Sequence, residues 1–170
     1  MDNLYQIEGG YLVATPRISN EALREALVYI YQIDEDLVSG IVMNKPFTPS
    51  KTVGDFLAYP KHFSERPVWQ GGPVSKDRLI AFCQNDKDIY ITDRLTHLTP
   101  QQIDHSMIFV GQCVWDSQTL SNQIRQGHWV LVGSDDMIPD HIPAEERINF
   151  VLGTAGVDLN RYVALAPEVV

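Results

Sequence analysis

The chain has 170 residues, of which 44% are hydrophobic and 21% charged, and its formal net charge is −9. These values are typical of a folded soluble protein, and a chain of this length forms a core without a disulfide or a metal. A strongly acidic chain repels phosphate backbones, so direct binding of nucleic acid is not expected. The sequence contains no apolar run near the ~20 residues that span a membrane and no secretory signal, so we expect a cytoplasmic protein without membrane contact.

The first third of the chain predicts short strands joined by turns. An apolar strand is expected at 11–14, followed by a helical turn at 21–24 that Ser19 or Asn20 would cap. Residues 26–33 are aromatic and β-branched, which favours a strand. An acidic turn separates them from a further strand at 39–44, and such a pair is typical of a hairpin.

The middle of the chain predicts a short helix at 53–58 and a strand at 68–74 that runs into a glycine turn. Two further strands, 79–84 and 89–92, are joined by a polar turn at 85–88, as in a hairpin. Helices are then expected at 100–104 and 144–152, with a last helical turn at 159–163.

The stretch 107–132 gives the clearest pattern, a strand followed by a helix and a second strand. An apolar run from Met107 continues to Trp115, and Asp116 stands where a carboxylate caps a helix N-terminus. The helix is expected over 117–126, with Gly127 as its stop, before a strand at 128–132. Two strands joined by a crossover helix should be parallel, with a right-handed connection.

Seven or eight strands and four or five short helices are therefore expected, and they do not alternate regularly. A regular βαβ fold needs a crossover helix after most strands, whereas the first half contains hairpins. We predict an α+β fold with a mixed, bent sheet, formed by one domain over residues 1–170.

No catalytic or metal-binding motif is complete. The five histidines lack the spacing of a helical metal pair, and the sequence has no nucleophile elbow, phosphate loop or dinucleotide fingerprint. Ser134-Asp135-Asp136 offers too few oxygens for a cation and is better explained as a capping loop. Cys83 and Cys113 fit buried apolar thiols, with a reactive Cys113 as the alternative. We predict no cofactor and no metal.

Three blocks resemble the bacterial AlgH/YqgE family of small cytoplasmic proteins, which has no established activity. They follow the family's order over most of the chain: Gly10 to Pro16 with Ser39 to Pro46; Val68 to Val74 with Asp77-Arg78; and Gly111 to Trp115 with Gly127-His128-Trp129 and Ser134-Asp135. The resemblance implies an α+β fold whose bifurcated sheet curls into a pseudo-barrel with short flanking helices.

This chain also departs from the family pattern. Glu25 replaces the arginine usual before the second strand, and Val114 replaces a glycine of the third block. Tyr31 and Ile33 stand where a cysteine and a histidine are frequent. A role based on that cysteine therefore does not transfer to this chain.

The motifs suggest a groove for a ligand, formed by Asn44, the Gly71-Gly72 turn and Asp77-Arg78. Asn44 and Arg78 would hydrogen-bond an anionic or polar ligand, and the glycine amides would form a small nest. The structural alternative is that Asp77 pairs with Arg78, Asn44 ends a strand and the glycines permit a bend.

Trp115 and Asp116 are candidates for a second wall of this groove, with Trp129 beside them. A tryptophan supplies a large apolar surface and one donor, which suits a planar ligand. Packing of both tryptophans in the core is the alternative.

The function expected from these features is binding of an unknown small ligand or protein partner, without catalysis. The family name derives from a link to regulation of alginate synthesis, which implies a regulatory role, and the acidic charge makes such a role indirect. The alternative is an enzyme that acts on a small anionic metabolite around Asn44 and Arg78. A third hypothesis is a surface for self-association.

Overall fold

A computed structural model describes residues 7–58, 61–84, 89–133, 138 and 141–155 of the chain. The strands are β1 (Tyr11–Ala14), β2 (Leu27–Asp34), β3 (Leu37–Val42), β4 (Val68–Gln70), β5 (Val74–Gln84), β6 (Ile89–Thr92), β7 (Ser106–Asp116) and β8 (Trp129–Val132). The α-helices are α1 (Lys61–Ser64), α2 (Pro100–Asp104), α3 (Ser117–Arg125) and α4 (Arg147–Ala155), with short 3-10 turns at Glu21–Leu23, Val53–Asp55, Leu95–His97 and Ala144–Glu146. The predicted α+β class is therefore confirmed. No described helix is both long and apolar enough to span a bilayer.

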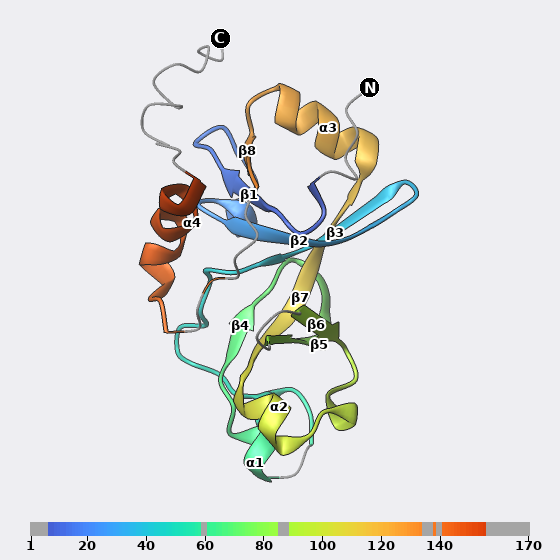
Figure 1. Ribbon diagram of the computed structural model, residues 1–170, viewed down its shortest axis with the longest axis vertical. Helices are drawn as coiled ribbons and strands as arrows, with labels where there is room; N and C mark the ends of the chain where they lie inside the picture. The colour runs from blue at the N-terminus through green and yellow to red at the C-terminus, as the bar shows by residue number, and fades with distance from the viewer. Residues whose placement is uncertain (1–6, 59–60, 85–88, 134–137, 139–140, 156–170) are drawn as a thin grey trace.

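The long strand β7 organises the sheet, whose main order is β6-β5-β7-β3-β2-β1-β8. Its first half pairs antiparallel with β5 and parallel with the short strand β4. Its second half pairs antiparallel with β3. The sheet thus branches at β7, which runs from α2 at one end of the molecule to α3 at the other (Figure 1).

The sheet is not closed, so the expected pseudo-barrel is not confirmed. Among the described residues, β6 pairs with β5 alone and β8 pairs with β1 alone, which leaves these strands at the two ends of the order. A cleft of about 500 Å³ lies between them, with Ile89 of β6 and Leu131 of β8 in its lining. The two sheet edges therefore face one cleft without hydrogen-bonding to each other.

The strand-helix-strand prediction for 107–132 is confirmed in its main features. Asp116 caps α3, since its carboxylate accepts the N–H groups of Gln118 at 2.9 Å and Thr119 at 3.3 Å. Gly127 follows the helix with a φ of +80°. The successive antiparallel pairings from β7 through β3, β2 and β1 give β7 and β8 the same sense, although three strands separate them.

Several boundaries differ from the prediction. The second strand of the first hairpin covers Leu37–Val42, not 39–44, because the turn is reduced to Glu35-Asp36 and Asn44 lies beyond the strand. The expected strand at 68–74 is interrupted after Gln70, and the helix at 53–58 is one 3-10 turn. The predicted turn at 85–88, the Ser134-Asp135-Asp136 loop and the turn at 159–163 lie outside the described residues.

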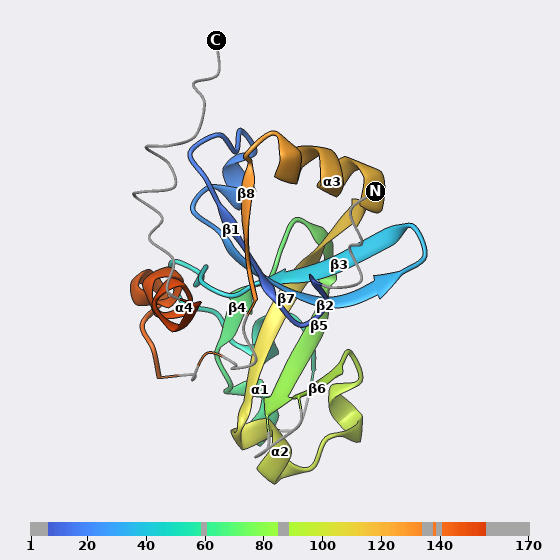
Figure 2. The same ribbon diagram turned by 45° about the horizontal axis from the view of Figure 1, so that its top comes forward.

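Buried side chains form three clusters on the two faces of the branched sheet. The central cluster joins the two branches to α4 and contains Tyr29, Phe82 and Phe109, whose rings meet edge to face. A second cluster lies between the β1–β2–β3 face and α3, and a third lies beneath α2. Both views place α4 beside the sheet, at the end away from the tip of the β2–β3 hairpin (Figures 1 and 2).

The Gly71-Gly72 turn rests directly on the backbone of β7. A Cβ on Gly71 would lie 2.4 Å from the Gly111 carbonyl oxygen, and one on Gly72 would lie 2.3 Å from the Gln112 carbonyl. Gly111 has a φ of +79°, and a Cβ on it would lie 2.4 Å from the Gly72 carbonyl oxygen. Glycine is required here for close approach of two backbones as well as for conformation.

Substitution of Gly71 tests this contact. We expect Gly71→Ala to lower the free energy of unfolding by about 3 kcal/mol, because backbone atoms cannot move aside as a side chain could. Gly153→Ala is the control: its Cβ would meet nothing within 4 Å on α4, so a gain of about 0.5–1 kcal/mol is expected. Chemical denaturation measures both, and an unchanged Gly71→Ala midpoint would contradict the contact.

Candidate functional site

A cavity of about 700 Å³ lies where the end of β1, the segment before β2, the segment after β3 and the start of the α4 region meet. It is lined by Ala14, Thr15, Pro16, Arg24, Glu25, Asn44, Lys45, Ala144, Glu145, Ile148 and Asn149. Its walls thus come from four segments that are distant in the sequence.

Asn44 holds one wall of this cavity together. Its side-chain oxygen accepts the Leu27 N–H at 2.9 Å, and its amide nitrogen donates to the Glu25 carbonyl at 2.9 Å. The Lys45 ammonium donates to the Arg24 carbonyl. The segment before β2 is therefore fastened to the segment after β3, and the Asn44 amide is occupied by this role.

Four polar side chains of the lining remain available to a ligand. Arg24, Glu25, Glu145 and Asn149 are exposed, and their side chains form no hydrogen bond or ion pair within the described ranges of the chain. Two carry a negative charge, one a positive charge, and one an amide. The cavity can therefore satisfy a small molecule that has both charged and neutral polar groups.

Arg147 fixes the opposite wall and was not identified from the sequence. The side chain is fully buried, with Nη1 donating to the Met43 carbonyl at 2.6 Å and Nε to the Ile142 carbonyl at 2.9 Å. The guanidinium carbon lies 4.1 Å from the centroid of the Trp69 ring, a cation–π distance. An arginine in the first turn of a helix gives no sequence signal of burial, which explains the omission.

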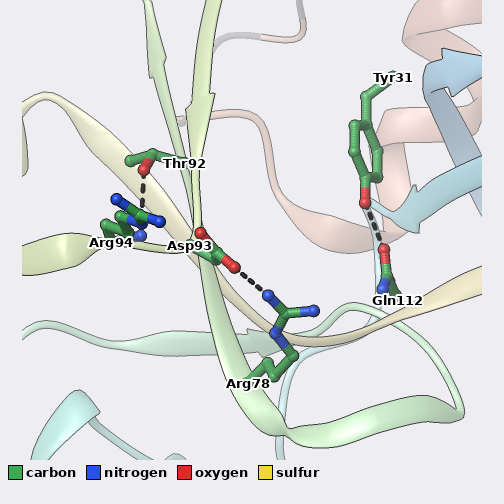
Figure 3. Close-up of polar contacts among 6 residues, drawn as sticks. All are labelled: Tyr31, Arg78, Thr92, Asp93, Arg94 and Gln112. Atoms are coloured by element: carbon green, nitrogen blue, oxygen red, sulfur yellow. Dashed lines mark hydrogen bonds and ion pairs between the residues drawn. The ribbon is translucent and has the colours of Figure 1, made fainter.

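Arg78, another predicted site residue, lies in a different polar cluster, shown in Figure 3. Arg78 points toward Asp93 and pairs with it, not with Asp77, and both members of the pair are partly exposed. Nearby, the Tyr31 hydroxyl donates to the side-chain oxygen of Gln112. Burial raises the pKa of Tyr31, an effect that a hydrogen bond with Ser39 and the charge of Arg78 oppose. Asp77 is exposed on the adjacent part of β5.

The glycines of the predicted nest are used in the fold. The Gly71 N–H donates to the Val110 carbonyl at 2.7 Å, and the Gly71 carbonyl accepts the Val42 N–H at 2.8 Å. Gly72 lines a separate hollow of about 210 Å³, which it shares with Lys45 and Lys76.

Trp115 and Asp116 lie far from Asn44. Trp115 is buried against Trp129, with ring centroids 5.8 Å apart at 84°. Trp115 pairs with Val38, near the start of β3. Asn44 lies six residues after Val38, which corresponds to about 20 Å at the rise of a β-strand. The structure thus divides the predicted groove: Asn44 lines the large cavity, and Gly72, Arg78 and Trp115 lie elsewhere. A ligand-binding role for these residues stays a prediction.

The two cysteines are free and buried. Burial raises the pKa of the Cys113 thiol to about 12 and also raises the pKa of Cys83. These findings favour apolar packing over a reactive Cys113. Within the described part of the chain, no three His, Cys, Asp or Glu side chains are grouped so that they could hold a metal ion.

Alkylation tests the state of Cys113. In a Cys83→Ser variant at pH 8, a pKa of about 12 leaves roughly one thiol in ten thousand ionised, against about a quarter for an unfolded cysteine. We expect iodoacetamide to label Cys113 in urea and to label the native protein at least a hundredfold more slowly, as followed by mass spectrometry. Fast native labelling would contradict the burial.

The raised pKa of Cys113 makes the free energy of unfolding depend on pH in the alkaline range. Because the folded pKa is raised, the stabilising effect of the thiol is complete below about pH 8.5 and is lost as the pH rises toward 12. Cys113→Ala should therefore show a shallower fall of unfolding free energy over this alkaline range than the parent protein. Identical slopes of unfolding free energy against pH in the variant and the parent would contradict the raised pKa of Cys113.

Curated relatives cover nearly the whole chain. A UPF0301 protein of Serratia proteamaculans is 25% identical over 171 aligned positions, covering 88% of this chain and 91% of that protein. A UPF0301 protein of Pseudoalteromonas translucida is 26% identical over 186 positions, covering 97% and 98%. Their designation is that of an uncharacterised family.

Two solved structures share the fold. The solution structure of the AlgH protein from Pseudomonas aeruginosa superposes with a TM-score of 0.72 at 18% identity, covering 99% of both chains. A crystal structure of a protein from Corynebacterium diphtheriae gives a TM-score of 0.64 at 15% identity, covering 87% and 88%. The family model described as AlgH-like matches residues 11–160. The chain therefore belongs to the AlgH-like family of proteins.

Proposed function

We propose that this protein is a cytoplasmic binding protein, without catalytic activity of its own, that holds a small polar ligand in the cavity between the β3 end and α4. The observation that carries this proposal is the cavity itself. Its volume of about 700 Å³ falls within the range of roughly 300–1,000 Å³ that is typical of small-molecule sites.

The construction of the walls supports the proposal. Asn44 and Arg147 hold the walls from behind through hydrogen bonds to backbone groups. Arg24, Glu145 and Asn149 face the cavity without being used in those contacts. A rigid frame with unengaged polar groups in front is the arrangement of a preformed binding site.

The enzyme alternative has weaker support. It requires Asn44 and Arg78 in one groove, whereas Arg78 is associated with Tyr31 and Asp93. Asn44 contacts Leu27, four residues before Tyr31 on β2, which corresponds to about 13 Å. A catalytic site also usually contains groups with displaced pKa values. Among the described residues, burial raises the pKa of Tyr29, Tyr31, Cys83 and Cys113, and none of these side chains lines this cavity.

A regulatory role, as the family name implies, would be indirect. The net charge of −9 opposes approach to a phosphate backbone, and so a bound ligand or a protein partner would carry the signal.

Ligand binding is tested by screening a library of polar metabolites against ¹⁵N-labelled protein. We expect a hit to shift the amide resonances of residues 24, 45, 145 and 149 together. Asn149→Trp should weaken binding, because the indole would occupy the part of the cavity beside Glu145. Thr154→Trp, which changes an exposed residue of the same helix outside the cavity, should bind like the parent. Ligands that bind Asn149→Trp as tightly as the parent protein would argue against the proposal. A library in which no compound binds would do the same.

The indirect role is tested by gel-shift titration with duplex DNA. No complex is expected at moderate salt, because weak non-specific contacts disappear as counterion release becomes less favourable. A complex that persists above physiological ionic strength would overturn this part of the proposal.

A further inference from the structure

We infer that the ligand of this cavity is a small zwitterion, of the size of a dipeptide, whose anionic end binds at Arg24 and Lys45 and whose ammonium end binds at Glu145. This inference rests on the proposed function and specifies the chemical class that the same site would select.

The first wall is positively charged. Arg24 and Lys45 lie together there, since the Lys45 ammonium donates to the Arg24 carbonyl. Among the described lining residues, Glu25 is the one acid of this wall, which leaves a net charge of +1. The chain as a whole has a net charge of −9, so most of its surface repels anions. A local excess of basic groups therefore directs an anionic group to this wall. The Arg24 guanidinium has no partner among the described residues, which suits it to bind a carboxylate.

The second wall is negatively charged. Its described residues are Ala144, Glu145, Ile148 and Asn149, of which Glu145 is the one charged side chain. The Glu145 carboxylate is exposed and has no hydrogen-bond partner among the residues that the structure describes. It can accept two or more N–H groups from a ligand ammonium, and the Asn149 amide beside it can bind a neutral polar group.

The distance between these walls is fixed by the fold. Asn44 anchors the first wall to the start of β2, and Arg147 anchors the second wall to the Met43 carbonyl, one residue before Asn44. Glu145 forms no ion pair with Arg24 or Lys45 in the described structure, so both charges remain available to a ligand that bridges the walls. Two residues of extended chain span about 7 Å, and the cavity volume of about 700 Å³ accommodates a molecule of this size.

Three forms of one dipeptide separate the two charge requirements. Ala-Ala carries both charges, N-acetyl-Ala-Ala lacks the ammonium, and Ala-Ala-amide lacks the carboxylate. Each is titrated into the millimolar range against ¹⁵N-labelled protein. We expect Ala-Ala to shift resonances of residues 24, 45, 145 and 149, and each modification to weaken binding by about tenfold, the effect of one charge-assisted hydrogen bond.

Two variants connect each charge to its wall. Glu145→Gln should remove the preference for Ala-Ala over its acetylated form, and Arg24→Gln should remove the preference over the amide. Both side chains are exposed, so the fold should be unaffected. Glu146→Gln and Arg94→Gln are matched controls, since neither residue lines the cavity, and both should retain the parent preferences.

The outcomes separate this inference from the proposed function. Equal binding of all three forms at the cavity would overturn the charge requirement while supporting a ligand site. Binding that follows one charge only would replace the zwitterion by a simple anion or cation. Absence of any shift with the three peptides would overturn the inference, whereas the metabolite screen and Asn149→Trp decide the proposed function independently.

Discussion

The contact between the Gly71-Gly72 turn and β7 is the constraint on which the rest of the structure depends. Because neither glycine has a Cβ, the turn lies against the backbone at Gly111, and the Gly71 N–H reaches the Val110 carbonyl. The Gly71 carbonyl then accepts the Val42 N–H, which fixes the end of β3 relative to β4. The segment directly after β3, which includes Met43 and the cavity wall at Asn44, takes its position from this contact.

The buried guanidinium of Arg147 transmits that position to α4. Burial of a charge is costly, and the cost is offset only where donors meet good acceptors. Here two N–H groups reach backbone carbonyls, and the guanidinium carbon lies 4.1 Å from the ring centroid of Trp69 on β4. Met43 and Trp69 belong to the two segments that the glycine contact joins. The helix therefore has one docking position, and the cavity between it and the sheet has a defined width.

The sequence was informative where structure is determined locally. Asp116 was identified as a helix cap because a carboxylate satisfies N–H groups two and three residues away, and no distant contact is needed. The proposed groove required knowledge of which strands are neighbours, and it was divided because Trp115 and Asn44 lie at opposite ends of β3. Asn44 lines the large cavity, where its amide holds the backbone, and its predicted role toward a ligand stays a prediction. Arg147 could not be recognised, because a cation in the first turn of a helix is ordinarily on the surface.

The pairing of β1 with β8 has a consequence for synthesis of the chain. The first three strands are complete once residue 42 has been made, yet the partner of β3 begins at residue 106 and that of β1 at residue 129. At a synthesis rate of about 5–20 residues per second, the outer edge of β1 remains unpaired for roughly 5–20 s. Unpaired edges recruit other strands. We expect the acidic tip Asp34-Glu35-Asp36 of the first hairpin to matter at this stage, because its negative charge disfavours association between nascent chains that display the same two open edges.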